Sequence, residues 1–184
     1  MSVTTAAPVV PVVPAGTWGI DPTHSTVGFA VRHMVVATFR STFKAFDATL
    51  VADESGARLT GTVEAGSIDI ADPDFKGHLD APDFFDVANH PTLRFDSTEI
   101  RRDGDRLEVD GDLTIRGTTH RVTGTGTITE PTEDPYGNAR VGLSLQTTID
   151  RTAYGLNWNA PLPKGGMALA NEVTLNLELE LIKA

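Results

Sequence analysis

Histidine and acidic side chains are the groups in this sequence that could transfer protons or hold a metal ion. The 184 residues include 25 Asp and Glu residues and five histidines, His24, His33, His78, His90 and His120. They form no HExxH zinc motif and no paired-histidine spacing, and the chain has neither a GxSxG sequence nor a glycine-rich phosphate loop. The motifs therefore predict no catalytic residue, no metal site and no cofactor.

His33 is the histidine whose neighbours point most clearly to a function. Successive side chains of a strand face opposite sides of its sheet, so alternation places His33 on one apolar face with Phe29 and Val31. There it could hydrogen-bond the polar head of a ligand, ligate a haem, or act with a nearby carboxylate or metal as a catalyst. The alternative is a structural hydrogen bond to a backbone carbonyl or a carboxylate at the rim of the fold.

Arg151 and His24 are two further polar candidates. Arg151 follows Asp150 at the end of a predicted strand, where its guanidinium could pair with a buried carboxylate or with the headgroup of a ligand. His24 lies in the sequence DPTHS at 21–25, whose Asp and Thr favour a turn. We therefore expect a structural, hydrogen-bonded corner at His24.

The elements that position these residues are strands. Within 106–116, apolar residues alternate strictly with acidic residues and threonine, which is typical of a strand with one dry face and one wet face. The same pattern predicts eight strands, at 26–36, 38–51, 57–70, 92–101, 106–116, 118–129, 139–149 and 171–182. Short turn signals such as Asp103-Gly104 separate several of them, so consecutive strands are expected to pair antiparallel.

Two longer connections interrupt this pattern. The segment 71–91 is broken by prolines and suits one or two helical turns, which His78 and Asp83 are expected to fasten. The segment 150–170 carries Trp158 among several prolines and glycines and is expected to be an ordered loop. Long connections in an otherwise tight series of strands usually border or cover an end of the fold.

Eight strands of this length predict a closed sheet, because closure removes the unpaired edges that invite aggregation. The expected fold class is all-β, an eight-stranded antiparallel barrel with short helical connections. Such an interior is either filled by side chains or holds one slender ligand. Gly124 and Gly126, at alternate positions of one strand, could leave space for a ligand or let two backbones approach closely at a bend. Trp18 is expected to plug one end.

Charge and composition narrow the possible partners. The formal net charge of −10 repels phosphate backbones, so nucleic-acid binding is not expected. The chain has no cysteine, and its 40% of hydrophobic residues fits a single domain over 17–184. Residues 1–16 have no basic residue before their apolar run, which prolines interrupt, so we expect a flexible leader rather than a signal peptide or membrane span. The expected location is cytoplasmic.

Four motifs, in order along the chain, resemble those of the YceI-like family. They are WGIDPTHS at 18–25 with VGFAVRH at 27–33, HLDAPDFFDV at 78–87 with FDST at 95–98, GDLTIRG at 111–117, and IDRTAYGL at 149–156. This resemblance covers nearly everything from Trp18 to the C-terminus. It implies a lipocalin-like barrel whose apolar tunnel binds polyisoprenoid or similar amphiphilic chains, often as a dimer, with no established catalytic activity.

The resemblance and the hydrocarbon interior together favour a carrier of a long isoprenoid, quinone or fatty-chain ligand. We expect no stable membrane insertion, and a homodimer is possible. The residues expected to line the tunnel or orient the ligand are Phe29, Val31, His33, Phe43, Phe85, Leu113, Leu143, Arg151 and Trp158. The alternatives are an enzyme that acts on an isoprenoid-like substrate through His33, and a structural protein with a solid barrel.

Overall fold

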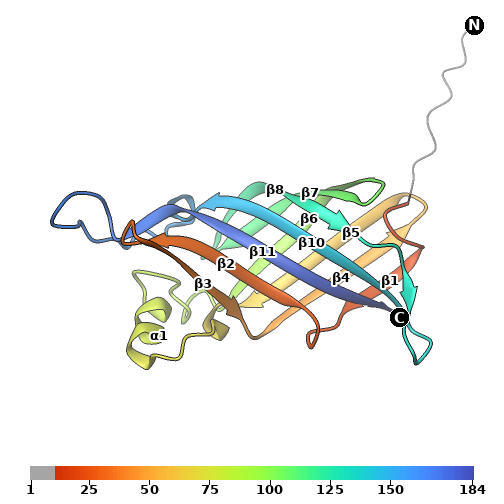
Figure 1. The fold of residues 1–184 in the computed structure, drawn as a ribbon, viewed down its shortest axis with the longest axis horizontal. Helices are drawn as coiled ribbons and strands as arrows, with labels where there is room; N and C mark the ends of the chain where they lie inside the picture. Colours follow the sequence, from red (N-terminus) through yellow and green to blue (C-terminus); the bar gives the residue numbers. More distant parts are fainter. Residues whose placement is uncertain (1–10) are drawn as a thin grey trace, which may run out of the picture.

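The structure, a computed structural model that describes residues 11–184, is a barrel of antiparallel strands (Figure 1). Eight strands close it in the order β1, β4, β5, β6, β7, β8, β10 and β11, and β11 pairs again with β1. The predicted all-β, eight-stranded antiparallel barrel is thereby confirmed. The helices are short, and within residues 11–184 none is long and apolar enough to cross a membrane.

The element bounds follow the chain from the closed end of the barrel and back. The strands are β1 (Gly16–Ile20), β2 (Thr26–His33), β3 (Ala37–Phe43), β4 (Phe46–Asp53), β5 (Gly56–Glu64), β6 (Thr92–Asp103), β7 (Arg106–Ile115), β8 (Thr118–Ile128), β9 (Thr132–Glu133), β10 (Ala139–Asp150) and β11 (Leu169–Lys183). The helical elements are η1 (Ala65–Ser67), α1 (Pro73–Asp80) and η2 (Arg151–Tyr154).

Some predicted strands are shorter or divided in the structure. The expected strand 38–51 is broken into β3 and β4 at Lys44 and Ala45, whose backbone bonds to Ser67 and Glu64 instead of continuing the ladder. The expected strand 57–70 ends at Glu64, where η1 begins. The sequence analysis missed β1 and β9, because strands of five and two residues are too short to show alternation.

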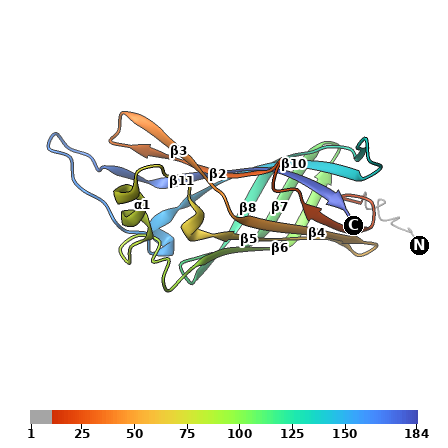
Figure 2. The same cartoon turned by 90° about the horizontal axis from the view of Figure 1, so that it is seen from below.

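Strand β11 is the longest and holds the two ends of the sheet together. Its residues 181–183 pair with β1, its residues 169–178 pair with β2, and its other edge pairs with β10. Strands β1 and β2 therefore behave as one strand that is interrupted at 21–25. The β2–β3 hairpin extends beyond the closed section, at the end of the molecule that also carries α1 (Figures 1 and 2).

Buried apolar side chains form two clusters along the barrel. The first includes Trp18 and Leu50 and fills the end where β1 lies, and the second includes Phe43 and Leu113 and fills the end near α1. The Trp18 side chain is fully buried, and its Nε1 donates a hydrogen bond to the Pro14 carbonyl at 3.0 Å. Trp18 therefore plugs the end opposite α1, as expected.

Part of the expected leader packs onto this plugged end. Val12 and Val13 are buried in the first cluster, and Arg102 donates a hydrogen bond from Nη1 to the Val12 carbonyl at 2.8 Å. The expected leader boundary at residue 16 is therefore wrong for these valines, because the composition of the segment does not reveal the apolar partners that they meet. The rest of the expected leader, residues 1–10, lies outside the described residues.

Replacing Trp18 with alanine should destabilise the fold strongly. Truncation of a fully buried aromatic side chain leaves a cavity and costs about 3–5 kcal/mol. Urea unfolding followed by circular dichroism measures this loss. The matched control is Tyr136→Ala, because Tyr136 is 88% exposed and its removal should leave the free energy of unfolding nearly unchanged. Equal midpoints for the two variants would contradict the assignment of Trp18 as the plug.

Candidate ligand-binding cavity

A cavity of about 150 Å³ lies inside the barrel, between the two apolar clusters. Its wall takes residues from both clusters, including Leu59 and Leu145 from the first and Phe43 and Leu113 from the second. Asp47 and Arg94 also belong to the wall, but both residues are exposed to solvent. The space itself is therefore surrounded by hydrocarbon and favours an apolar ligand.

The two glycines of β8 differ in what they do. A Cβ atom added at Gly124 would have no atom closer than 3.9 Å, and Gly124 lies in the wall of the cavity. A Cβ atom added at Gly126 would lie 1.8 Å from the Ser144 carbonyl oxygen. Gly124 therefore keeps space open, whereas Gly126 allows the backbones of β8 and β10 to approach closely.

Aromatic rings line the α1 end of the barrel in a continuous series, which we call the aromatic collar. Neighbouring ring centroids are 5.5–6.5 Å apart through most of the series, which suits tilted and edge-to-face packing. The members of the collar are Phe29, Phe39, Phe43, Phe75, Phe84, Phe85 and Trp158. Phe43 also lies in the cavity wall, so the collar begins where the cavity ends.

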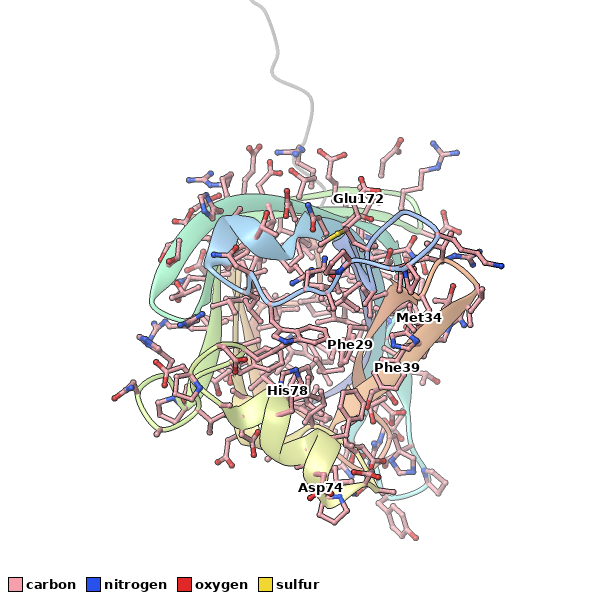
Figure 3. The ribbon with its side chains drawn as sticks, turned by 90° about the vertical axis from the view of Figure 1, so that its left-hand side faces the viewer. Phe29, Met34, Phe39, Asp74, His78 and Glu172 are labelled. Carbon is pink, nitrogen blue, oxygen red and sulfur yellow. The ribbon has the colours of Figure 1, made fainter. Side chains whose placement is uncertain are left out.

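His78 is the polar residue of this end that the sequence analysis assigned only to fastening a helix. Its ring lies edge-on to Trp158, with centroids 4.7 Å apart, and Figure 3 shows His78 together with Phe29 and Phe39 at the α1 end. Its Nε2 atom is buried and has no hydrogen-bond partner among residues 11–184. An unpaired buried polar atom is costly, so it would gain from a polar ligand group. The neighbouring Phe84 and Phe85 in the sequence were the available signal.

Arg151 is buried, and its guanidinium is engaged by backbone carbonyls. Nε donates to Ala170 at 2.8 Å, and Nη1 donates to Leu156 at 2.5 Å and to Trp158 at 2.9 Å. Burial lowers the pKa of Arg151 from its ordinary value, although the charge of Asp150 opposes this shift. Arg151 therefore fixes the connection that carries Trp158, and its bonds go to neither a carboxylate nor a position facing the cavity.

The prediction that His33 shares the dry face is wrong. His33 is exposed and ends β2, where it pairs with Ala37 and Leu169 beyond the closed section of the barrel. Alternation was read correctly, but at this position no opposite wall covers the inner face of the strand. A catalytic role of His33 on a ligand in the cavity therefore has no geometric support.

The remaining predicted residues fall into three places. Phe43 and Leu113 line the cavity. Phe29, Val31, Phe85 and Trp158 belong to or pack against the second cluster, which includes the collar. Leu143 is buried in the first cluster and is absent from the cavity wall, so its packing is structural.

Comparison with known proteins agrees with this architecture. A family model described as the YceI-like domain matches residues 18–181. The chain belongs to the YceI-like family. A UPF0312 protein from Staphylococcus epidermidis is 32% identical over 167 residues, which are 89% of this chain and 95% of that protein. Protein YceI from Escherichia coli O157:H7 is 33% identical over 129 residues, 68% of each chain.

Solved structures share the fold of this YceI-like chain. BcnA from Burkholderia cenocepacia has a TM-score of 0.74 at 23% identity, covering 88% of this chain and 98% of its own. A polyisoprenoid-binding domain from Saccharophagus degradans has a TM-score of 0.68 at 12% identity, covering 91% and 98%. At these identities the likeness concerns the fold alone.

The first YceI-like motif forms a polar clasp at the break between β1 and β2. His24 Nδ1 lies 2.8 Å from Asp21 Oδ2, and Arg140 Nη1 reaches both Asp21, at 2.8 Å, and Glu180, at 2.5 Å. Asp21, His24 and Glu180 are close enough to suit a metal ion, but the guanidinium of Arg140 already bonds both carboxylates. The predicted hydrogen-bonded corner at His24 is thereby confirmed.

The clasp should make stability depend on pH through His24. Hydrogen bonding to Asp21 and its negative charge raise the pKa of His24 above its ordinary value. The protonated clasp therefore stabilises the fold fully below about pH 6.5, the pKa of an unfolded histidine, and this contribution is lost as pH rises through the folded pKa.

Urea midpoints of the natural chain and His24→Gln, measured from about pH 5.5 to 8.5, test this dependence. The natural chain should exceed the variant most at the acid end, and the difference should shrink as pH rises. His33→Gln is the matched control, since His33 is exposed and forms no ion pair within residues 11–184. A difference that grows with pH would contradict the clasp.

Proposed function

We propose that this chain is a binding protein that holds a long apolar molecule, such as an isoprenoid, quinone or fatty chain, inside its barrel. The cavity with its hydrocarbon surroundings is the observation that carries this proposal. Each CH₂ group moved from water into such a space contributes about 0.8 kcal/mol. The structurally similar domain from Saccharophagus degradans is itself described as polyisoprenoid-binding, which supports the same ligand class.

The size of the cavity indicates how such a ligand would lie. An apolar cavity of about 150 Å³ holds a molecule the size of benzene. A longer chain would therefore bury one end in the cavity and extend through the aromatic collar, from Phe43 toward Phe85. The unpaired Nε2 of His78 lies at the outer part of this path and would accept or donate a hydrogen bond to a polar head.

This proposal differs from both alternatives in a specific observation. A solid barrel would leave no space beside Gly124, whereas the structure has an open cavity wall there. Catalysis through His33 would need that side chain near the ligand, whereas His33 is exposed beyond the closed section. The cytoplasmic location and the homodimer stay predictions.

Filling the cavity from Gly124 should abolish ligand uptake without introducing a polar group. In Gly124→Leu the new side chain enters open space, so the fold should persist while the volume for a ligand is lost. Uptake is measured by the fluorescence of cis-parinaric acid, an apolar chain that brightens when it leaves water. We expect the affinity of the variant to fall by about tenfold or more.

Thr125→Leu is the matched control, because Thr125 is the next residue of β8 and is exposed. It adds the same side chain on the outer face and should leave uptake unchanged. Unfolding in urea checks that both variants are folded. Full uptake by a folded Gly124→Leu variant would overturn the cavity as the binding site.

The identity of a bound molecule is a separate measurement. Mass spectrometry of the organic extract of the protein, purified from its own host without detergent, is compared with the same mass of Gly124→Leu. A long-chain species enriched in the natural chain and depleted in the variant would identify the ligand class. Equal extracts would count against a retained ligand.

A further inference from the structure

Four aliphatic side chains project into solvent at the end of the barrel that carries the collar. Met34, Val35 and Val36 form the turn of the β2–β3 hairpin and are 42%, 58% and 79% exposed, and Met167 of the neighbouring loop is 46% exposed. We call these four residues the apolar tip. Met34 donates a backbone hydrogen bond to the Ala168 carbonyl at 2.7 Å, so hairpin and loop form one surface.

The backbone of the tip is unfavourable for the residues that occupy it. Met34 and Val35 have φ angles of 52° and 62°, in the left-handed region that glycine and asparagine prefer. Val36 donates to the His33 carbonyl at 3.2 Å, which closes a two-residue hairpin of the kind where Asn-Gly is favoured. A β-branched valine at this position therefore does not serve the stability of the turn.

The charges around the tip differ in sign from those of the whole protein. The chain carries a formal net charge of −10, yet residues 30–41 and 157–170 contain Arg32, Arg40 and Lys164 and no acidic residue. The acidic residues labelled on this face, Asp74 and Glu172, lie toward its opposite edges, away from Met34 (Figure 3). A basic rim around an apolar tip is complementary to a surface that is anionic outside and apolar within.

The tip is also continuous with the path proposed for the ligand. Phe39 lies on the same hairpin as Met34 and packs against Phe29 and Phe75 of the collar. Phe75 is itself 39% exposed. Apolar surface therefore runs from the outside of the molecule through the collar to the cavity.

We propose that the apolar tip docks this protein onto a lipid bilayer that contains anionic lipids, with the open end of the barrel facing the membrane. The aliphatic side chains would enter the headgroup layer while Arg32, Arg40 and Lys164 contact lipid phosphates. The tip protrudes as a convex turn, which suits a fluid surface. Passage of a ligand between membrane and cavity through this contact rests on the proposed function, but docking itself does not.

Flotation with lipid vesicles tests the docking. The natural chain should float with phosphatidylcholine vesicles that contain about 30 mol % phosphatidylglycerol, and float less with phosphatidylcholine alone or at high salt. The double variant Met34→Asn with Val35→Gly should bind these vesicles about tenfold more weakly or less. Since Asn-Gly suits the turn, its urea midpoint should equal or exceed that of the natural chain.

Tyr136→Gly is the matched control. Tyr136 is an 88% exposed aromatic residue in the turn before β10, at the far end of the barrel from α1 (Figure 1), and its loss should leave flotation unchanged. Failure of the natural chain to float would overturn the proposal, and so would equal flotation of the double variant. A dimer of the natural chain that the double variant dissociates, seen by analytical ultracentrifugation, would assign the tip to a second copy and also overturn it.

The two proposals can fail independently. Gly124→Leu should lose uptake of cis-parinaric acid and keep flotation, whereas the tip variant should lose flotation and keep uptake from solution. Loss of uptake alone in a natural chain that still floats would remove the ligand and leave the docking intact.

Discussion

The barrel depends on one strand having two successive partners along a single edge. Strand β11 pairs with β1 over its last residues and with β2 over the preceding ones, while β10 occupies its other edge throughout. The sheet therefore closes tightly at one end, where Trp18 is buried, and continues as a hairpin at the other. The plugged end, the cavity and the aromatic collar follow from this arrangement in that order along the barrel axis.

Polar interactions sit where this arrangement would otherwise leave backbone groups without strand partners. The clasp of Asp21, His24 and Arg140 spans the break between β1 and β2. Arg151 does the same for the connection after β10, because its guanidinium bonds several carbonyls that no strand uses. These side chains hold the chain in place from the walls and ends of the barrel, which leaves the interior to hydrocarbon.

Alternation along the strands was enough to predict the barrel, its eight-stranded closure and the inward position of Phe43 and Leu113, because period-two patterns depend only on neighbouring residues. It could not locate His33, whose face lacks a covering wall, or Leu143, whose inward position lies in the plugged cluster. It also could not separate Gly124 from Gly126. That difference depends on how closely β10 approaches β8, which is a property of three-dimensional packing.

The hairpin that overhangs the barrel has one further consequence. Strand β3 is the terminal strand of the sheet, and within residues 11–184 its outer edge meets the rest of the chain near Thr42 and Phe43, through Asp69 and Ile68. Local stability should therefore decline along the barrel axis, with amide hydrogens of β3 exchanging through local opening and those around Leu50 only through global unfolding. The open end could then loosen while the plugged end keeps the fold intact.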